Sequence, residues 1–270
     1  MVKIRWLVVL ICLLAVLGSS GWATVMPSGS LQWVKGQGWV GLRVSGPDPD
    51  GSAVQPAPLA EGQGSILFKT ASGETEWIAS GDYSGDCVTN TGQRVKVSWD
   101  ASISGARVSV VPDGWTAENI TLVWKAEKGE DFFGGGEVWS GSVNQRGKTV
   151  RMWVKNGTPD QCCYVPFFFS SRGYGVYVES HEHGLIHFAT PEYPDKVVLT
   201  FDTKDSQGLV FHCIHERRPS KMIDCYTAIT GRPPLPPKWS FLPWKWRDKH
   251  EGWHEVFEDA EGRPSNDVPG

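Results

Sequence analysis

Short apolar stretches alternate with polar residues along most of the chain, with the two-residue period of β-strands. Five such stretches are rich in β-branched or aromatic residues: 65–69, 94–99, 107–111, 120–124 and 197–201. Clusters of Gly, Asp, Asn and Pro separate them at intervals of roughly ten residues. This pattern predicts a large antiparallel β-sandwich from about residue 24 to about residue 211. Residues 46–64, rich in Pro, Gly and Asp, are expected to form an exposed loop.

The pattern changes near Arg217, where the alternation stops. Residues 221–229 predict a short helix, which Thr230-Gly231 would end. Residues 232–238, Arg-Pro-Pro-Leu-Pro-Pro-Lys, follow as a stiff polyproline connector. We therefore expect the N-terminal β-sandwich domain to cover residues 24–231, with the connector as its boundary.

Beyond the connector, residues 239–246 are strand-like, and residues 251–261 have the strongest helical pattern of the chain. A strand followed by a helix after a linker is typical of the first unit of an α/β domain. A single βα pair cannot bury both of its faces. Residues 239–270 are therefore expected to hold the start of such a domain, incomplete within this sequence.

The N-terminus has the layout of a secretory signal peptide. Lys3 and Arg5 precede an apolar run from Trp6 to Leu17, and Gly21 and Ala23 stand at the cleavage-determining positions. The run of 12 residues covers about 18 Å as a helix, less than a hydrocarbon core of about 30 Å. The sequence predicts removal of residues 1–23 and a secreted or periplasmic protein without membrane association; an uncleaved anchor is the alternative.

The overall composition narrows the range of partners. Hydrophobic residues make up 40% of the chain and charged residues 21%, so a substantial core can form and extensive disorder is excluded. The net charge of −4 and the lack of a basic stripe argue against a nucleic-acid partner. The 14 Trp outnumber the 11 Phe and 6 Tyr, which suits either a stiff β core or stacking on flat ligands.

Five cysteines remain after signal cleavage: Cys87, Cys162, Cys163, Cys213 and Cys225. Because the number is odd, at least one thiol stays outside an intramolecular disulfide. A Cys213–Cys225 bridge is compatible with the sequence. No Cys-x-x-Cys pair occurs, so a zinc site of that kind is not expected.

Three blocks of the sequence carry a family resemblance. The first is Phe-Phe-Gly-Gly-Gly-Glu at 132–137, followed by Asn-Gln-Arg-Gly at 144–147 and Trp-Val-Lys-Asn-Gly-Thr at 153–158. The second is the aromatic run at 164–178, and the third, at 226–241, contains the proline connector. In this order they resemble glycoside hydrolase family 31, the α-glucosidase and α-xylosidase family.

The resemblance implies a galactose mutarotase-like β-sandwich followed by a (β/α)8 catalytic barrel, with the proline connector between them. On that map residues 239–246 are the first barrel strand and residues 251–261 begin the first barrel helix. The complete family member is a retaining hydrolase of α-glucosides or α-xylosides that uses no cofactor. An α-linked oligosaccharide or glycoside is therefore the expected partner.

The catalytic residues of the family are not expected in this chain. Retaining glycosidases need two carboxyl groups about 5–5.5 Å apart, one as nucleophile and one as acid/base. The family carries its nucleophilic Asp in a Trp-x-Asp-x-x-Glu motif on barrel strand four, whereas residues 239–270 reach only the first barrel unit on this map. The chain is thus interpreted as the N-terminal, carbohydrate-associated part of an exported family 31 glycosidase. The alternative is a stand-alone carbohydrate-binding β-sandwich without catalysis.

Five residues are candidates for substrate binding. By resemblance, Asn156 takes the position of a family Asp whose loop reaches the barrel mouth and contacts sugar hydroxyls; an ordinary turn residue is the alternative. Trp153 belongs to the same motif. Trp244, Trp246 and Arg247 lie near the carboxyl end of the expected first barrel strand, where barrel active sites collect their residues. Core packing is the alternative for the two tryptophans.

One rival motif points to a zinc metallopeptidase. His250-Glu-Gly-Trp-His254 matches the His-Glu-x-x-His pattern, in which two His on one helical face bind zinc. Gly252 weakens the required helix, and Phe257 and Ala260 stand where the longer signature has Gly and His. The match is interpreted as coincidental.

Other histidines are close together in the sequence: His181, His183, His187, His212 and His215. They could form a metal site if their strands were neighbours, since residues i and i+2 share one strand face. Surface imidazoles without a metal are the alternative, and no metal is expected. Glu137, in the glycine-rich block, is interpreted as structural rather than as a catalytic acid.

Overall fold

The computed structural model describes residues 31–36, 39–44, 53–54, 60, 63–80, 85–102, 105–138, 141–153 and 161–241. The predicted signal peptide, Asn156 and residues 242–270, with Trp244, Trp246, Arg247 and the His250–His254 motif, lie outside this set. Contacts divide the chain into two compact units, Met1–Thr230 and Gly231–Gly270. Among the described residues, no helix is long and apolar enough to cross a membrane.

A small antiparallel sheet contains the first strands, β1 (Leu31–Gly36), β2 (Trp39–Val44) and β3 (Ala53–Val54). Leu31 pairs with Val44 and Gly36 with Trp39, so the two long strands form a hairpin. Residues 46–64 were expected to be loop throughout, but β3 lies within them and pairs with β2.

The remaining strands form one antiparallel sheet of 13 strands, in the order β10-β12-β13-β16-β8-β7-β6-β5-β4-β9-β15-β14-β11. Their bounds are β4 Ile66–Lys69, β5 Thr75–Ser80, β6 Gly85–Thr89, β7 Arg94–Ser102, β8 Gly105–Pro112, β9 Asn119–Lys125, β10 Phe132–Val138, β11 Thr149–Arg151, β12 Gln161–Ser170, β13 Tyr174–Val178, β14 Gly184–Phe188, β15 Lys196–Asp202 and β16 Leu209–His215. The five strands predicted from the sequence are confirmed as β4, β7, β8, β9 and β15.

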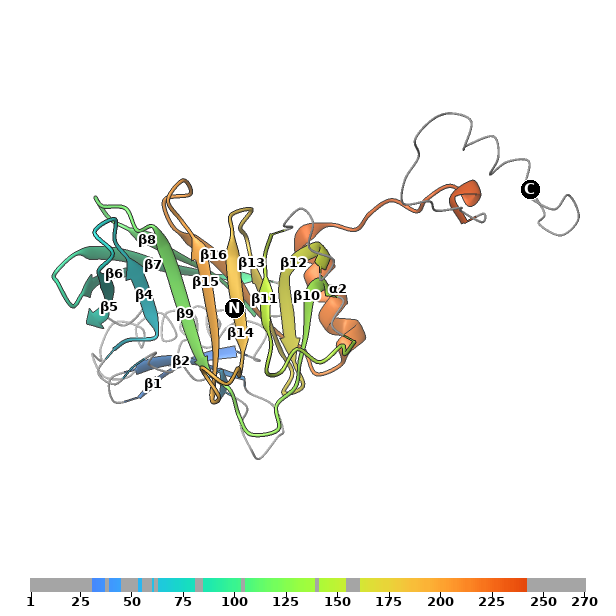
Figure 1. The fold of residues 1–270 in the computed structure, drawn as a ribbon, viewed down its shortest axis with the longest axis horizontal. Coiled ribbons are helices and arrows are strands. Elements are labelled where there is room, and N and C mark those ends of the chain that lie inside the picture. The colour runs from blue at the N-terminus through green and yellow to red at the C-terminus, as the bar shows by residue number, and fades with distance from the viewer. Residues whose placement is uncertain are drawn as a thin grey trace, which may run out of the picture. The chain divides into compact units, whose positions relative to one another are not determined.

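The large sheet folds into the two layers of a sandwich, joined through β5 (Figure 1). One end of β5 pairs with β4, at Trp77 and Leu67, and its other end pairs with β6, at Ile78 and Thr89. Strand β5 therefore belongs to both layers and continues the strand pairing from one layer to the other. The mainly β, antiparallel architecture expected from the sequence is confirmed.

Aromatic side chains fill the space between the layers. Trp124 of β9 meets Phe211 of β16 edge-on at 6.2 Å, and Phe188 of β14 meets Phe168 of β12 edge-on at 5.0 Å. Strand alternation places these side chains inward; in β8, for example, residues 106, 108, 110 and 112 are buried while those between them are partly exposed. Burial of this apolar surface is the main source of the domain's stability.

Helix α2 (Pro219–Thr230) covers the outer face of β12, β13 and β16. Its buried Met222 packs with Phe167 and Ile214, and Tyr226 stacks on Phe167 with ring centroids 4.3 Å apart. A proline in the first turn and Gly231 at φ +89° just after the last residue suit a helix start and end. The helix predicted over 221–229 is confirmed, two residues longer at its start and one at its end.

The prediction of a barrel strand over residues 239–246 is wrong for its first residues. They belong to a 3-10 helix, η1 (Lys238–Phe241). The Ser240 amide donates to the Pro237 carbonyl at 3.0 Å, and the Ser240 hydroxyl donates to the same oxygen at 2.6 Å. Proline sets φ near the value of a tight turn and offers no N–H to a ladder, so the Pro-Pro pair favours a turn here. The rest of that expected strand lies outside the described residues.

Candidate functional site

The glycine-rich block forms strand β10, which comes unusually close to β12. An added Cβ at Gly136 would lie 2.2 Å from the Cys163 carbonyl oxygen, and one at Gly134 would lie 2.5 Å from that of Phe167. Both glycines have positive φ, +99° and +113°, which side chains disfavour. The pairing with β12 shifts register between Gly134 and Gly136, as in a β-bulge. Glycine is therefore required here by sterics and by backbone geometry.

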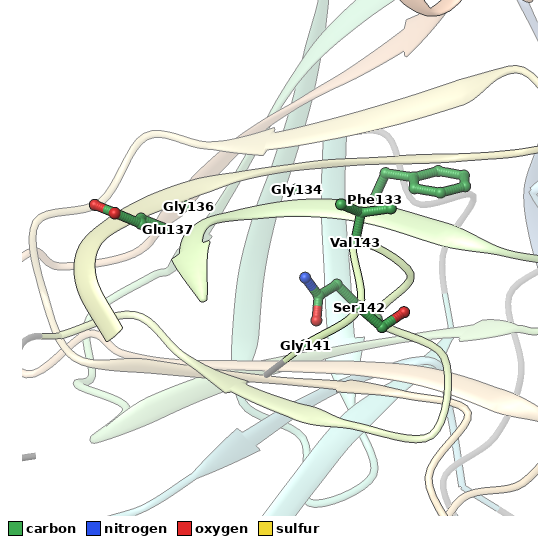
Figure 2. Close-up of a pocket in the computed structure, with 8 residues that line it drawn as sticks. Phe133, Gly134, Gly136, Glu137, Gly141, Ser142 and Val143 are labelled. Carbon is green, nitrogen blue, oxygen red and sulfur yellow. The ribbon is translucent and has the colours of Figure 1, made fainter. Parts of the chain in front are cut away.

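A pocket of about 450 Å³ lies beside this irregular strand (Figure 2). Its lining residues come from β10 and from the loop that follows: Phe133, Gly134, Gly136, Glu137, Gly141, Ser142, Val143 and Gln145. The Phe133 ring and the exposed Glu137 carboxylate lie at opposite ends of the lining in Figure 2. The pocket thus combines an aromatic side chain, exposed glycine backbone and several polar groups.

The second part of the family block, Asn144 to Gly147, anchors the loop to β10. The Asn144 side-chain oxygen accepts from the Phe132 amide at 3.2 Å, and its side-chain nitrogen donates to the Asp131 carboxylate at 2.6 Å. The Arg146 guanidinium donates to the Glu130 carbonyl at 2.7 Å. The side chains of Asn144 and Arg146 therefore fix the loop that lines the pocket against the start of β10.

Gln145, between these two anchors, is the residue of the site that the sequence interpretation missed. Gln145 is 4% exposed, and its backbone N–H donates to the Phe132 carbonyl at 2.8 Å. The side-chain oxygen is buried and has no hydrogen-bond donor among the described residues. No local pattern signals this, because a glutamine in a polar loop is normally exposed.

Trp153, a predicted substrate-binding residue, lies at the end of the described loop after β11. It is partly buried, and its ring meets the His183 imidazole at 5.0 Å with a tilt of 31°. The Arg151 guanidinium carbon lies 6.0 Å from the Trp153 ring centroid, within range of a cation–π contact. Asn156, three residues further on, lies outside the described residues, so its predicted sugar contact stays a prediction.

The histidines that were weighed as a metal site do not converge. The His187 ring contacts the Thr149 hydroxyl at 3.1 Å, and the His215 ring donates to the Gly173 carbonyl at 2.8 Å. Burial lowers the pKa of both His187 and His215. No group of three or more His, Cys, Asp or Glu gathers among the residues that the structure describes.

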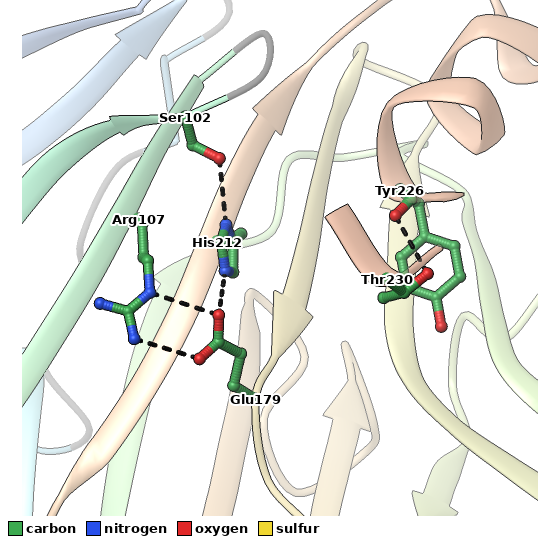
Figure 3. A network of polar contacts seen from close by, with 6 residues as sticks. All are labelled: Ser102, Arg107, Glu179, His212, Tyr226 and Thr230. Carbon is green, nitrogen blue, oxygen red and sulfur yellow. Dashed lines mark hydrogen bonds and ion pairs between the residues drawn. The ribbon is translucent and has the colours of Figure 1, made fainter. Parts of the chain in front are cut away.

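A polar network that the sequence did not predict connects β7, β8, β16 and the residue after β13 (Figure 3). The Glu179 carboxylate accepts from Arg107 at 3.3 and 3.1 Å and lies 2.5 Å from His212 Nε2. The other ring nitrogen of His212 lies 3.2 Å from the Ser102 hydroxyl. The residues that bond to each other in this network are 33 to 110 positions apart in the sequence, so no local motif reveals the network.

The electrostatics of this network favour an ionised Glu179. Burial raises its pKa, but hydrogen bonds from Arg107 and His212 more than offset burial, so the net pKa lies below its usual value. His212 is buried and its ring lies over Tyr177 at 5.6 Å. The Ser–His–Glu trio is therefore a clamp between strands, with its imidazole covered, rather than an open nucleophilic site.

The suggested Cys213–Cys225 disulfide does not form. Cys213 faces the core between the layers, whereas Cys225 belongs to helix α2 on the outer face of the same sheet. The sheet itself separates the two sulfur atoms. Complete burial raises the pKa of the Cys213 thiol to about 12.

Comparison with known proteins connects these features to a family. Residues 52–183 match the family model for the glycosyl hydrolase 31 N-terminal galactose mutarotase-like domain. The alpha-xylosidase XylQ of Lactiplantibacillus pentosus is 34% identical over 118 residues, covering 43% of this chain and 15% of that protein. The isomaltosyltransferase of Sporosarcina globispora is 29% identical over 167 residues, covering 57% of this chain and 15% of that protein. The chain thus spans about 15% of the length of these relatives.

A solved structure shares the fold. The GH31 family sulfoquinovosidase from E. rectale, in complex with an aza-sugar inhibitor, superposes with a TM-score of 0.53 at 13% identity. The match covers 74% of this chain and 34% of that one. The matched family model includes the glycine-rich strand, the pocket loop and Trp153. Residues 52–183 of this chain are therefore identified as the N-terminal galactose mutarotase-like domain of glycoside hydrolase family 31.

Proposed function

We propose that this chain is the N-terminal, carbohydrate-associated part of an exported glycosidase that hydrolyses α-glucosides or α-xylosides with retention. The match of residues 52–183 to the N-terminal domain of family 31 carries the proposal. The relatives named alpha-xylosidase and alpha-glucosidase support the choice of substrates. The predicted signal peptide at residues 1–23 supports export.

In this proposal the sandwich shapes the substrate site and a barrel supplies the chemistry. Asn156 would contact sugar hydroxyls from the sandwich side, with Trp153 in the same motif. Trp244, Trp246 and Arg247 would line the pocket from the first barrel strand. The nucleophile and the acid/base would come from further barrel sequence, because the family carries them from barrel strand four onward. Residues 246–251, Trp-Arg-Asp-Lys-His-Glu, have the letters of the nucleophile motif but stand at the end of the expected first barrel strand.

The test compares this chain with the product of its coding DNA read past Gly270. The longer product should hydrolyse aryl α-xyloside or α-glucoside, and proton NMR of the first product should show the retained α-anomer. Residues 24–270 alone should be inactive, because the barrel strands that carry the catalytic carboxylate pair in the family come after the first barrel unit. Turnover by residues 24–270 that is abolished by replacing one of their own acids would contradict the proposal.

A second candidate is a carbohydrate-binding sandwich without catalysis, favoured by the pocket that the sandwich itself contains. A genuine stop codon directly after Gly270, together with sugar binding by the purified chain, would select this candidate. An open reading frame that continues through a complete barrel, with a Trp-x-Asp-x-x-Glu motif on its fourth strand, would select the glycosidase.

Asn156 provides a residue-level prediction within the glycosidase proposal. In the longer, active product, Asn156→Asp should change the ratio of kcat/KM for glucoside over xyloside, because a carboxylate binds hydroxyls more strongly than an amide. Asn156→Ala should lower kcat/KM by an amount equivalent to about 1–3 kcal/mol, the usual effect of leaving buried partners unpaired. Equal ratios and equal absolute values in all three versions would show that Asn156 is a turn residue only.

A further inference from the structure

We propose that the pocket between β10 and residues 141–145 binds a neutral, polyhydroxylated ring, such as one sugar unit, and that Gln145 recognises one of its hydroxyls. The site belongs to the sandwich alone. It goes beyond the proposed hydrolysis, because it needs neither the barrel nor any catalytic carboxylate.

Gln145 is the main observation behind the site. Its side chain lines the pocket, and its buried side-chain oxygen lacks a donor among the described residues. Buried polar atoms in folded proteins almost always have a partner, so an orphan acceptor at a pocket points to a donor that arrives with a ligand. An O–H group is a donor of suitable size and carries no charge into a buried place.

The other lining groups suit the same ligand. The Phe133 ring offers an apolar face against which the C–H face of a sugar ring can pack. The Ser142 hydroxyl lies 3.2 Å from the Asn144 amide and 3.4 Å from the Asn144 carbonyl, and a hydroxyl oxygen has a second lone pair to offer. The Glu137 carboxylate also accepts hydroxyl hydrogens.

The charge of the pocket disfavours anionic ligands. Among the described lining residues, Glu137 is acidic and none is Lys or Arg. Lys148 is close to the loop, but its ammonium group donates to the Ser142 carbonyl at 3.0 Å. A phosphate or carboxylate ligand would meet a negative charge in the lining, whereas neutral hydroxyls would not.

The shape of the pocket is also appropriate. Its volume of about 450 Å³ lies within the range of about 300–1,000 Å³ of small-molecule sites. Gly134 and Gly136 present backbone without side chains to the pocket, and the Asn144 and Arg146 anchors fix the loop that carries Gln145. A site held in place before binding loses little entropy when the ligand arrives.

The test is titration of the purified chain with glucose and xylose, followed by saturation-transfer NMR and calorimetry. Glucose 6-phosphate and glucuronate serve as anionic probes and should bind more weakly than glucose. Gln145→Met keeps the length of the side chain and removes the acceptor. It should weaken sugar binding at least tenfold and leave the melting temperature unchanged or higher, because it also removes an orphan buried oxygen. Phe133→Ala should weaken binding as well.

The matched control is Gln93→Met, the same substitution at an exposed position in the turn between β6 and β7, and it should bind sugar like the wild type. The inference is overturned if neither sugar binds at tens of millimolar, if Gln145→Met binds like the wild type, or if a crystal soaked in sugar shows only a water at the Gln145 oxygen. If the longer product hydrolyses glycosides but this chain binds no sugar, only the pocket inference fails. If this chain binds sugar but the longer product hydrolyses no glycoside, only the glycosidase proposal fails.

Discussion

At the scale of single residues, Glu179 combines two kinds of charge-assisted hydrogen bond in one partly exposed carboxylate. It accepts two bonds from Arg107 and lies against a buried histidine, on strands that are distant in sequence. Exposure screens such interactions, and the Glu179 side chain is 35% exposed. Its contribution to stability should therefore be real but modest.

We predict that Glu179→Gln lowers the free energy of unfolding at pH 7 by about 1 kcal/mol. The folded-state pKa of Glu179 is lowered, so its stabilisation is present above the unfolded pKa near 4.5 and is lost as pH falls through the folded value. Urea unfolding at pH 7 and pH 3 should show a gap between variant and wild type that shrinks in acid. Asp86→Asn, at an exposed carboxylate on β6, is the control. A gap of constant size at both pH values would contradict the prediction.

Cys213 offers a second prediction at this scale. Its thiol is buried with a pKa of about 12, whereas Cys163 on β12 is exposed. The thiolate is the reactive species, so a thiol-specific reagent at pH 8 should label Cys163 in the native protein and Cys213 only after unfolding. Mass spectrometry of labelled peptides makes the comparison. Rapid native labelling of Cys213 would show that the two layers open far more often than their packing implies.

At the scale of elements, strand β10 depends on glycine for two separable reasons, steric and conformational. Gly136→Ala should destabilise the protein by about 2–5 kcal/mol, because a Cβ meets β12 backbone at 2.2 Å and the residue has φ +99°. Gly141→Ala, at φ +74° with no atom within 4 Å of the added Cβ, should cost only about 1–2 kcal/mol. The difference between the two losses of stability, measured by thermal unfolding, gives the steric contribution at Gly136. Equal losses would mean that β10 can move away from β12.

The elements differ in how far the sequence could predict them. Strands such as β8 and β15 were found because their alternation and β-branched residues act locally. The prediction of a strand was wrong for the first residues after the connector. A hydrogen bond from the Ser240 amide to the Pro237 carbonyl closes a turn there, although the apolar residues had suggested an extended strand. The conformation there depends on adjacent prolines more than on hydrophobic pattern.

The candidate site could be predicted only in part, for a physical reason. The resemblance drew attention to the glycine-rich block and to Trp153, which the structure places at β10 and beside His183. The buried oxygen of Gln145 and the Glu179 network depend on contacts across strands, which only the folded sheet creates. Long-range pairing of this kind is invisible to a local pattern.

At the scale of the whole molecule, the two units should separate in proteolysis. Beyond Thr230 the described side chains include Leu235, 96% exposed, and Phe241, 74% exposed. Limited digestion of residues 24–270 should leave a resistant fragment that ends near the proline connector, and that fragment should melt at the same temperature as the parent chain. A parent chain as resistant beyond residue 238 as before it, or a fragment that melts clearly lower, would show that the second unit stabilises the first.

The two outermost strands of the described 13-stranded sheet, β10 and β11, have a consequence for association between copies. A long, regular outer strand exposes N–H and C=O groups on which another chain can build a cross-molecular sheet. β10 is interrupted by register shifts at Gly134/Gly136 and Glu137/Val138, and β11 has only three residues. Neither offers the regular spacing that an incoming strand needs. The irregular glycine-rich strand beside the pocket and the short β11 should therefore disfavour edge-to-edge polymerisation of the sandwich.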